Sequence, residues 1–199
     1  MKFAFFHAVV YAAGLLIVLS LMPFASAEQG PLMTLVWSDD FGEDGEIDQN
    51  KWTVIKGDGC PQLCGFGNKE RQTYTSKKRN LRIEDGKLII EAHKRKTYTS
   101  AKVTTQKFDG WKYGKISVRA KLPSGIGTWP AIWMLPDENS YGGWPQSGEI
   151  DIMEHVGFNP GVVHGTVHTE AYNHKINTQK GAEIKVPDAA QAFHTYSVE

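Results

Sequence analysis

Three carboxylates stand close together inside an apolar segment, and they constrain this chain more than any other feature does. Glu149, Asp151 and Glu154 lie among isoleucine and methionine residues. Side chains of an extended strand alternate between two faces, so the first two acids share a face and Glu154 falls on the other. A β-bulge, one extra residue near Ile152 or Met153, would bring all three to one face, and bulges recur beside active sites. A helix would spread the acids and suits isoleucine-rich sequence less well.

The N-terminus predicts an exported protein. Lys2 precedes an apolar run from Ala8 to Met22, and Ala25-Ser-Ala27 follows, which is the three-part pattern of a secretory signal with cleavage after Ala27. Residues 1–27 are therefore interpreted as a signal peptide, and residues 28–199 as one domain with a substantial core. A retained membrane anchor is the alternative, because the apolar run approaches the length that spans a bilayer.

Charge and cysteine content narrow the possible partners. Removal of the leader takes away one base and no acid, which leaves 21 bases and 22 acids. This balance argues against a nucleic-acid or membrane-surface role. Cys60 and Cys64 lie in a glycine-rich segment, and in an exported chain a short disulfide-closed loop is their expected state. Two thiols alone make a poor zinc site.

Short alternating segments separated by glycine turns predict an all-β chain. Strands are expected at residues 33–41, 52–55, 87–93, 113–122, 129–135, 149–154, 161–169 and 193–199, with an irregular loop at 57–68. No convincing amphipathic helix is present in the sequence. Such a pattern implies a β-sandwich, and jelly rolls solve the edge problem for these chains. The last segment alternates up to Glu199 without a turn, which predicts a sandwich that is incomplete at the C-terminus.

The acids suit the hydrolysis of a glycosidic bond. Retaining enzymes need two carboxyl groups about 5 to 5.5 Å apart, one to attack the sugar and one to protonate the leaving oxygen. Glu149 and Glu154 can supply this pair, and Asp151 can hydrogen-bond the attacking carboxylate. Crowding raises at least one of the three pKa values, because like charges oppose joint ionisation. One group therefore stays protonated near neutral pH.

Structural explanations for these residues stay open. The acids could form an exposed polar face or a cation site, although hard-cation loops show glycine and asparagine spacing. Core packing explains any single tryptophan, but Trp129, Trp133 and Trp144 all lie within a few strands of the acids, and indole rings stack on sugars. His155 is interpreted as structural, whereas His168 could be structural or bind substrate. Motifs for a serine nucleophile, a phosphate loop or a dinucleotide are absent from the sequence.

The residues around the acids resemble glycoside hydrolase family 16, and its laminarinase branch in particular. The resemblance rests on Glu149–Glu154, on Trp129–Met134 and on Tyr113–Leu122, and it runs from about Leu32 to Glu199. It implies a concanavalin A-like jelly roll with a concave glucan cleft. It also implies a secreted, retaining endo-β-1,3-glucanase that hydrolyses laminarin-type β-glucans through a covalent glycosyl-enzyme. Branches acting on mixed-linkage glucan or xyloglucan typically lack the residue interpreted as a bulge.

Position by position, the resemblance makes Glu149 the nucleophile, Glu154 the general acid and base, and Asp151 the helper beside the nucleophile. The substrate-binding residues that it implies are Asn68, Trp129 and Trp133 on the donor side and His168 on the leaving-group side. No metal is assigned to this site, and no cofactor is expected to be required. Family members often carry a structural calcium on the convex side, and Asp40 and Gly86 occupy positions that supply some of its ligands.

The expected partner is a β-glucan polysaccharide. The protein is expected to be a secreted monomer, extracellular or periplasmic, with no nucleic-acid partner and no membrane contact after signal cleavage. One alternative is a non-catalytic β-glucan-binding protein with the same cleft, which the presence of both Glu149 and Glu154 disfavours. Another is the same fold acting on mixed-linkage glucan or on a marine galactan.

Overall fold

The computed structural model describes residues 33–199, so the predicted signal peptide, residues 1–27, lies outside the described residues. Residues 35–199 form one compact unit. Strands and turns make up this unit, and its described helices are two short 3-10 turns, η1 (Cys64–Gly67) and η2 (His174–Ile176). Neither these turns nor any other described helix has the length and apolar character needed to cross a membrane. The prediction of an all-β chain is confirmed.

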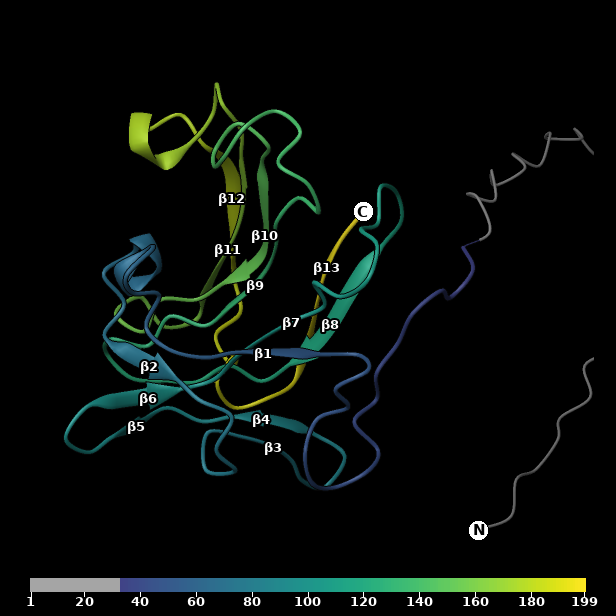
Figure 1. The fold of residues 1–199 in the computed structure, drawn as a ribbon, viewed down its shortest axis with the longest axis vertical. Coiled ribbons are helices and arrows are strands. Elements are labelled where there is room, and N and C mark those ends of the chain that lie inside the picture. The colour runs from purple at the N-terminus through teal and green to yellow at the C-terminus, as the bar shows by residue number, and fades with distance from the viewer. Residues whose placement is uncertain (1–32) are drawn as a thin grey trace, which may run out of the picture. The chain divides into compact units, whose positions relative to one another are not determined.

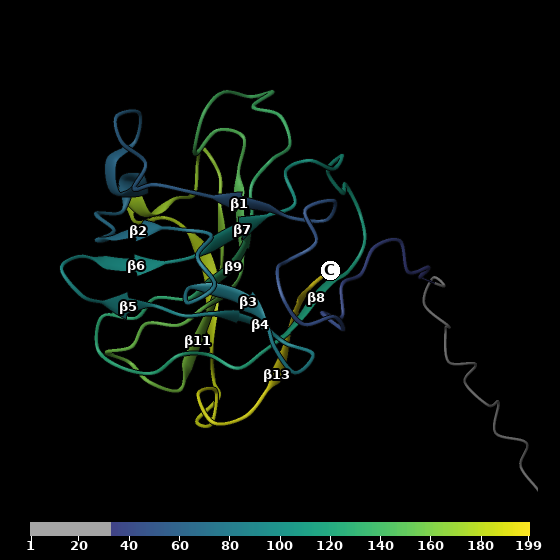
Figure 2. The same ribbon diagram turned by 60° about the horizontal axis from the view of Figure 1, so that its bottom comes forward.

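Short strands pair into five small sheets (Figures 1 and 2). The pairs are β1 (Thr53–Ile55) with β7 (Lys102–Thr104), β3 (Leu81–Ile83) with β4 (Leu88–Ile90), and β8 (Ile116–Ala120) with β13 (His194–Val198). A three-stranded sheet has the order β2 (Gln72–Tyr74), β6 (Tyr98–Ser100) and β5 (His93–Lys94). The largest has the order β12 (Lys180–Lys185), β11 (Val162–His168), β10 (Glu149–Glu154) and β9 (Ala131–Met134). We call this last sheet the acid sheet.

Strand β10 of the acid sheet contains the predicted bulge. Two steps along β10, from Asp151 to Met153, correspond to one step along β9. Three steps, from Asp151 to Glu154, correspond to two along β11. Ile152 and Met153 consequently both pack against the same core cluster, although they are adjacent in sequence. The prediction of one extra residue near these positions is confirmed.

Two hydrophobic clusters hold the strands in place. The first is formed by Leu122, Met153, Val163, Ala189 and Tyr196, and the second by Ile47, Leu81, Ile83 and Ala101. Met153 is 1% exposed, and full burial of such a side chain contributes roughly 1.5–3 kcal/mol. The first cluster packs against β10 from the face opposite its acids, so core packing fixes the direction in which the acids point.

The strand expected at residues 33–41 is wrong, because this segment pairs with no strand of the described chain. The Asp39 carboxylate accepts the backbone N–H of Phe41 at 3.1 Å. Phe41 adopts a left-handed backbone with φ of 56°, which interrupts an extended run. The Trp37 ring packs edge-on against Trp52, with ring centroids 5.4 Å apart. Side-chain packing, rather than a ladder of backbone hydrogen bonds, holds this segment.

The other expected strands are present, most of them shorter than predicted. Within residues 113–122, Ile116–Ala120 form β8, with the expected alternation of exposed and half-buried side chains. The buried strand expected at residues 87–93 is instead split into β4 and β5. Ile90, at the end of β4, is 48% exposed, so this strand is not buried on both faces.

Candidate active site

The bulge places Glu149, Asp151 and Glu154 on one face of the acid sheet, which we call the acid face. Asp151 pairs with Trp133 across β9, and Glu149 pairs with His168 across β11. Residues directly opposite one another in a ladder point to the same side. The acid face therefore gathers the three carboxylates, Trp133 and His168.

Asp151 is the buried member of the three acids, with 6% of its surface exposed. Burial raises the pKa of Asp151 to about 8, and the neighbouring charges of Glu149 and Glu154 and a hydrogen bond with Glu149 act in the same direction. Asp151 is consequently protonated at neutral pH and can donate a hydrogen bond to the Glu149 carboxylate. This is the protonated group that carboxylate crowding predicted.

Trp129 holds the third acid. Its indole Nε1–H donates a hydrogen bond of 2.8 Å to Oε1 of Glu154. The Trp129 ring is 55% exposed, so its face is open to a ligand while its edge is bound to the carboxylate. One residue therefore orients an acid and offers a stacking surface beside it.

An ammonium group among aromatic rings borders the acids on the β9 side. Nζ of Lys102 lies 4.8 Å from the ring centroid of Trp133, 4.7 Å from that of Phe66 and 5.9 Å from that of Tyr74. Burial lowers the pKa of Lys102, whereas the charges of Glu70 and Glu149 raise it. Lys102 was not among the residues predicted from the sequence. In the amino-acid sequence, Lys102 is a single basic residue within a short alternating strand, which gives little indication of a role.

Asn68 lies at the end of the loop that supplies Phe66 to this group. It follows η1, donates its backbone N–H to the carbonyl of Gly65 at 2.9 Å, and has an exposed side chain. The predicted disulfide between Cys60 and Cys64 closes the preceding part of the loop. Asn68 thus lies two residues after Phe66, on the exposed end of this loop.

His168 lies on the acid face but is buried beside Asp151 rather than open to solvent. It is 5% exposed, and its Nε2 is 3.4 Å from Oδ2 of Asp151. Its ring packs edge-on against Trp144 and His174, with centroids 5.8 and 5.1 Å away. The His174 ring in turn packs against Trp144 at 4.8 Å. This geometry lets His168 position Asp151, and it extends the site to His174, which was not predicted from the sequence.

His155 has the structural role that the sequence predicted. It is 1% exposed, and its Nε2 accepts the backbone N–H of Gly161 at 3.2 Å. This hydrogen bond connects the end of β10 to the start of β11. The residue therefore stabilises the turn next to the acids and does not face them.

Donor atoms of Glu149, Asp151 and His168 lie within 4.8 Å of one another, a spacing that a metal ion could use. Within residues 33–199, Asp40 belongs to no comparable group of carboxylate and imidazole donors. The Asp40 Oδ1 atom accepts the backbone N–H of Gly42 at 3.3 Å. Calcium at Asp40 would thus depend on backbone carbonyls and water. Structural calcium stays a prediction.

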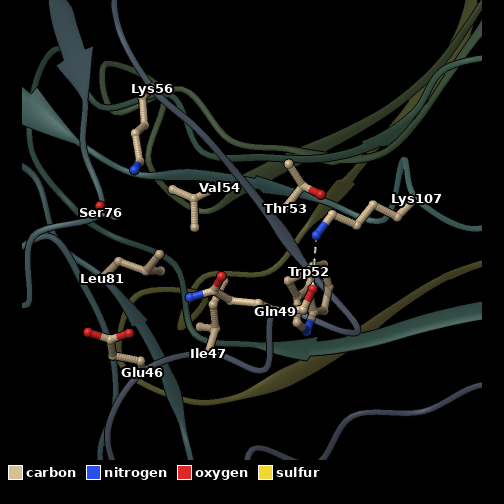
Figure 3. A pocket seen from close by; sticks show the side chains of 10 residues that line it. All are labelled: Glu46, Ile47, Gln49, Trp52, Thr53, Val54, Lys56, Ser76, Leu81 and Lys107. Carbon is tan, nitrogen blue, oxygen red and sulfur yellow. Dashed lines mark hydrogen bonds between the residues drawn. The ribbon is translucent and has the colours of Figure 1, made fainter.

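A cavity of about 270 Å³ lies apart from the acids, beside the second core cluster (Figure 3). Ile47, Trp52, Val54 and Leu81 supply its apolar lining, and Lys107 donates a hydrogen bond of 3.1 Å to the carbonyl of Gln49 at its edge. The three acids do not line it.

Comparisons with known proteins agree with this geometry. The family model described as glycosyl hydrolases family 16 matches residues 68–199. A beta-glucanase of Rhodothermus marinus is 48% identical over 196 residues, which cover 95% of this chain and 67% of that protein. The X-ray structure of the laminarinase from Rhodothermus marinus superposes with a TM-score of 0.77 at 52% identity, covering 83% of this chain and 66% of that one.

A further similar structure contains a bound sugar. It is a mutant of SCLam, a non-specific endo-β-1,3(4)-glucanase, co-crystallised with 1,3-β-D-cellotriosyl-glucose. Its TM-score is 0.77 at 43% identity, over 82% of this chain and 66% of that one. The chain thus spans about two thirds of the length of these proteins. The structural likeness confirms the β-sandwich jelly roll.

Proposed function

The chain belongs to glycosyl hydrolase family 16, and we propose that it is a secreted, retaining endo-β-1,3-glucanase that cleaves laminarin-type β-glucans. The observation that carries this proposal is the joint placement of Glu149, Asp151 and Glu154 on the acid face by the bulge in β10. The similar proteins named beta-glucanase and laminarinase support the substrate class.

The proposed reaction proceeds by double displacement. Glu149 attacks the anomeric carbon while Glu154 donates a proton to the leaving oxygen, which forms a glycosyl ester at Glu149. Glu154 then removes a proton from a water molecule that attacks the same carbon, and the ester bond breaks. Protonated Asp151 donates a hydrogen bond to the Glu149 carboxylate, and the Trp129 N–H holds the Glu154 carboxylate. No metal is part of this sequence of steps.

The donor part of the glucan is proposed to lie over β9. The rings of Trp129 and Trp133 are 55% and 37% exposed on the acid face and offer stacking surfaces to sugar C–H groups. The Lys102 ammonium lies 4.8 Å from the Trp133 ring. It can therefore donate hydrogen bonds to the hydroxyls of a sugar that stacks on this ring. Asn68, on the adjoining loop, is proposed to contribute a further polar contact.

Export is proposed from the N-terminal leader, with cleavage after Ala27 and a monomeric product outside the cell or in the periplasm. The disulfide between Cys60 and Cys64 supports this placement, because such bonds persist in oxidising compartments. N-terminal sequencing of the protein recovered from culture medium or periplasm would test the cleavage site. Recovery of the intact leader in the membrane fraction would contradict it.

Hydrolysis of mixed β-1,3(4)-linked glucan is the second candidate, because the similar structure with a bound oligosaccharide is a non-specific endo-β-1,3(4)-glucanase. Release of reducing sugar from laminarin, lichenan, agar and carrageenan separates these activities. The proposal expects release from laminarin. No release from any polymer would favour a non-catalytic glucan-binding protein instead.

Azide rescue tests the two catalytic roles separately. Glu149→Gly and Glu154→Gly are each expected to lower hydrolysis of laminarin by at least about 100-fold. With an activated aryl laminarioside and azide, Glu149→Gly should form the α-glycosyl azide, because azide replaces the missing nucleophile. Glu154→Gly should form the β-glycosyl azide, because azide attacks the glycosyl-enzyme. Full activity of either variant, or exchanged products, would contradict the assignment.

A further inference from the structure

A group of basic side chains lies at one edge of the three-stranded sheet, beside β5. Half of the group comes from the turn before β3, and half from the end of β5 and the loop that joins it to β6. We call this group the basic edge, and its members are Lys77, Lys78, Arg79, Lys94, Arg95 and Lys96. The loop between β5 and β6 projects at the left margin of the unit formed by residues 35–199 in both ribbon views (Figures 1 and 2). All members except the half-buried Arg79 are exposed.

Hydrogen bonds hold the two segments of the basic edge side by side. Nε2 of His93, on β5, lies 2.9 Å from the carbonyl oxygen of Arg79. The buried Asn80 amide donates to the carbonyl of Glu91 at 2.9 Å and to the hydroxyl of Thr99 at 3.2 Å. A strand rises about 3.3 Å per residue, so the loop residues after β5 lie within about 10 Å of these contacts. This is about one Debye length at 0.1 M ionic strength, and the six charges therefore act jointly on a ligand.

The positive charge of the basic edge is not compensated by acids. None of its members forms a salt bridge within the part of the chain that the structure describes. Glu84 and Glu91, the acids nearest in sequence, are bound instead by Arg82, at 2.6 and 2.9 Å. Apart from the six members, residues 33–199 hold 15 bases and 21 acids. Positive charge is thus concentrated at this edge of a chain whose bases and acids balance.

The chemistry of the basic edge fits a sugar polymer with anionic groups. Lysine and arginine donate hydrogen bonds and accept none, which suits repeated carboxylate or sulfate groups. Tyr98, opposite Lys94 in the ladder of β5 and β6, is 38% exposed, and Nζ of Lys94 lies 5.3 Å from its ring centroid. An exposed ring beside cations offers a stacking face to a sugar and charge to its anionic substituent. The balanced net charge and the proposed export both disfavour nucleic acid as the ligand.

The basic edge is separate from the proposed catalytic cleft. Tyr74 of β2 lies near the Lys102 ammonium, which borders the acids, whereas β5 forms the opposite edge of the same sheet. Two strand spacings, about 10 Å, lie between β2 and β5. A polymer bound beside β5 would therefore leave the acids and the tryptophans of the acid face free for the glucan.

We propose that the basic edge binds an anionic polysaccharide, and so holds the enzyme on a matrix in which the neutral glucan is embedded. This inference goes beyond the proposed function, because the anionic polymer is bound and not cleaved. The preference for a polyanion rests on the uncompensated charges. The choice of a polysaccharide rests on Tyr98 and on the proposed export.

Dextran sulfate and unmodified dextran test this inference, because they share a backbone and differ in charge. Isothermal titration calorimetry should show that the protein binds dextran sulfate, or the polyuronate alginate, but not dextran, and the tighter of the two ligands identifies the anionic group. Binding should weaken as salt is added, because salt screens exposed charges. Lys94→Gln/Arg95→Gln/Lys96→Gln, the loop variant, is expected to weaken binding about tenfold, the order expected for three lost exposed ion pairs. Lys77→Gln/Lys78→Gln should weaken it several-fold.

A charge-matched control lies on and around β8. Lys112→Gln/Lys115→Gln/Lys121→Gln removes three exposed charges and should bind like the unsubstituted protein. The loop variant should hydrolyse laminarin at the unsubstituted rate. Equal losses of binding in the loop variant and the control, or equal binding of dextran and dextran sulfate, would overturn the inference. Tighter binding to duplex DNA or to phosphatidylglycerol vesicles would also overturn it. If the unsubstituted protein binds dextran sulfate but does not hydrolyse laminarin, the proposed function fails and this inference stands.

Discussion

In the proposed mechanism, Asp151 acts on the Glu149 nucleophile through a hydrogen bond. Its protonated carboxyl can donate a hydrogen bond to Glu149, and hydrogen bonds to charged groups are worth about 1.5–3 kcal/mol. Asp151→Ala is therefore expected to lower kcat/KM on laminarin by roughly 10- to 100-fold. Asp151→Asn keeps a donor at the same place and should lose less. Equal losses in the two variants, measured by initial rates at neutral pH, would show that donation is not the role.

Trp129 combines two roles that substitution can separate. Trp129→Phe keeps an aromatic ring but removes the N–H that binds Glu154, so kcat is expected to fall about tenfold with a smaller change in KM. Trp129→Ala also removes the ring and should raise KM in addition. Trp133→Phe is the comparison, since it shrinks the neighbouring ring and should act mainly on KM. A Trp129→Phe variant with unchanged kcat would contradict the orienting role.

The sequence pattern identified the three acids but not all of the residues that surround them in the structure. Counting strand parity at Glu149, Asp151 and Glu154 led to the bulge, because alternation is a local property. Like-charge crowding predicted one raised pKa, and burial decides that it belongs to Asp151. Lys102 was missed because its aromatic neighbours come from β9, β2 and the loop after Cys64, far apart in sequence. Such contacts exist only after the strands assemble.

Strands were predictable where one face is buried. The alternation in residues 113–122 and 161–169 predicted β8 and β11, since each packs one side against a core. Strand β12 was not expected, and all six of its residues are exposed, so hydrophobic alternation could not reveal it. The strand expected at 33–41 failed for the opposite reason. Leu35 and Val36 are exposed, Trp37 and Phe41 pack against Trp52, and the segment lacks a pairing strand in the described chain.

The loop of residues 57–68, whose first part the Cys60–Cys64 disulfide closes, is expected to set donor binding. It presents Phe66 to the Lys102 ammonium at 4.7 Å, and closing a loop this short contributes at most roughly 2 kcal/mol. Replacing Cys60 and Cys64 together by Ser should raise KM for laminarin several-fold more than it lowers kcat. A thiol reductant should produce the same change in the unsubstituted protein and none in the double variant. An unchanged KM for laminarin, both in the double variant and in the reduced unsubstituted protein, would contradict this role.

The arrangement of the whole molecule depends on pairings between distant segments. Strand β13 pairs with β8, and β2 pairs in parallel with β6, although neither partner is adjacent in sequence. Composition and alternation therefore predicted the class, an all-β sandwich, but not which strands are neighbours. The jelly-roll expectation came from the family resemblance, whose specific residues cluster around the acids. Strand order then places β11 and β12 on the far side of those acids from Trp133.

Stability of the whole domain should depend on pH through Asp151. Its pKa is about 8 in the folded protein against an ordinary value of 3.8, so between these values the folded state holds a proton that the unfolded state has lost. The free energy of unfolding must then fall as pH rises from about 4 to 8. Asp151→Asn removes this dependence. Its Tm should match that of the unsubstituted protein near pH 4 and exceed it increasingly up to about pH 8, whereas the exposed Asp109→Asn should show no such trend. A Tm difference that stays constant over this range would show that Asp151 is not held protonated by the fold.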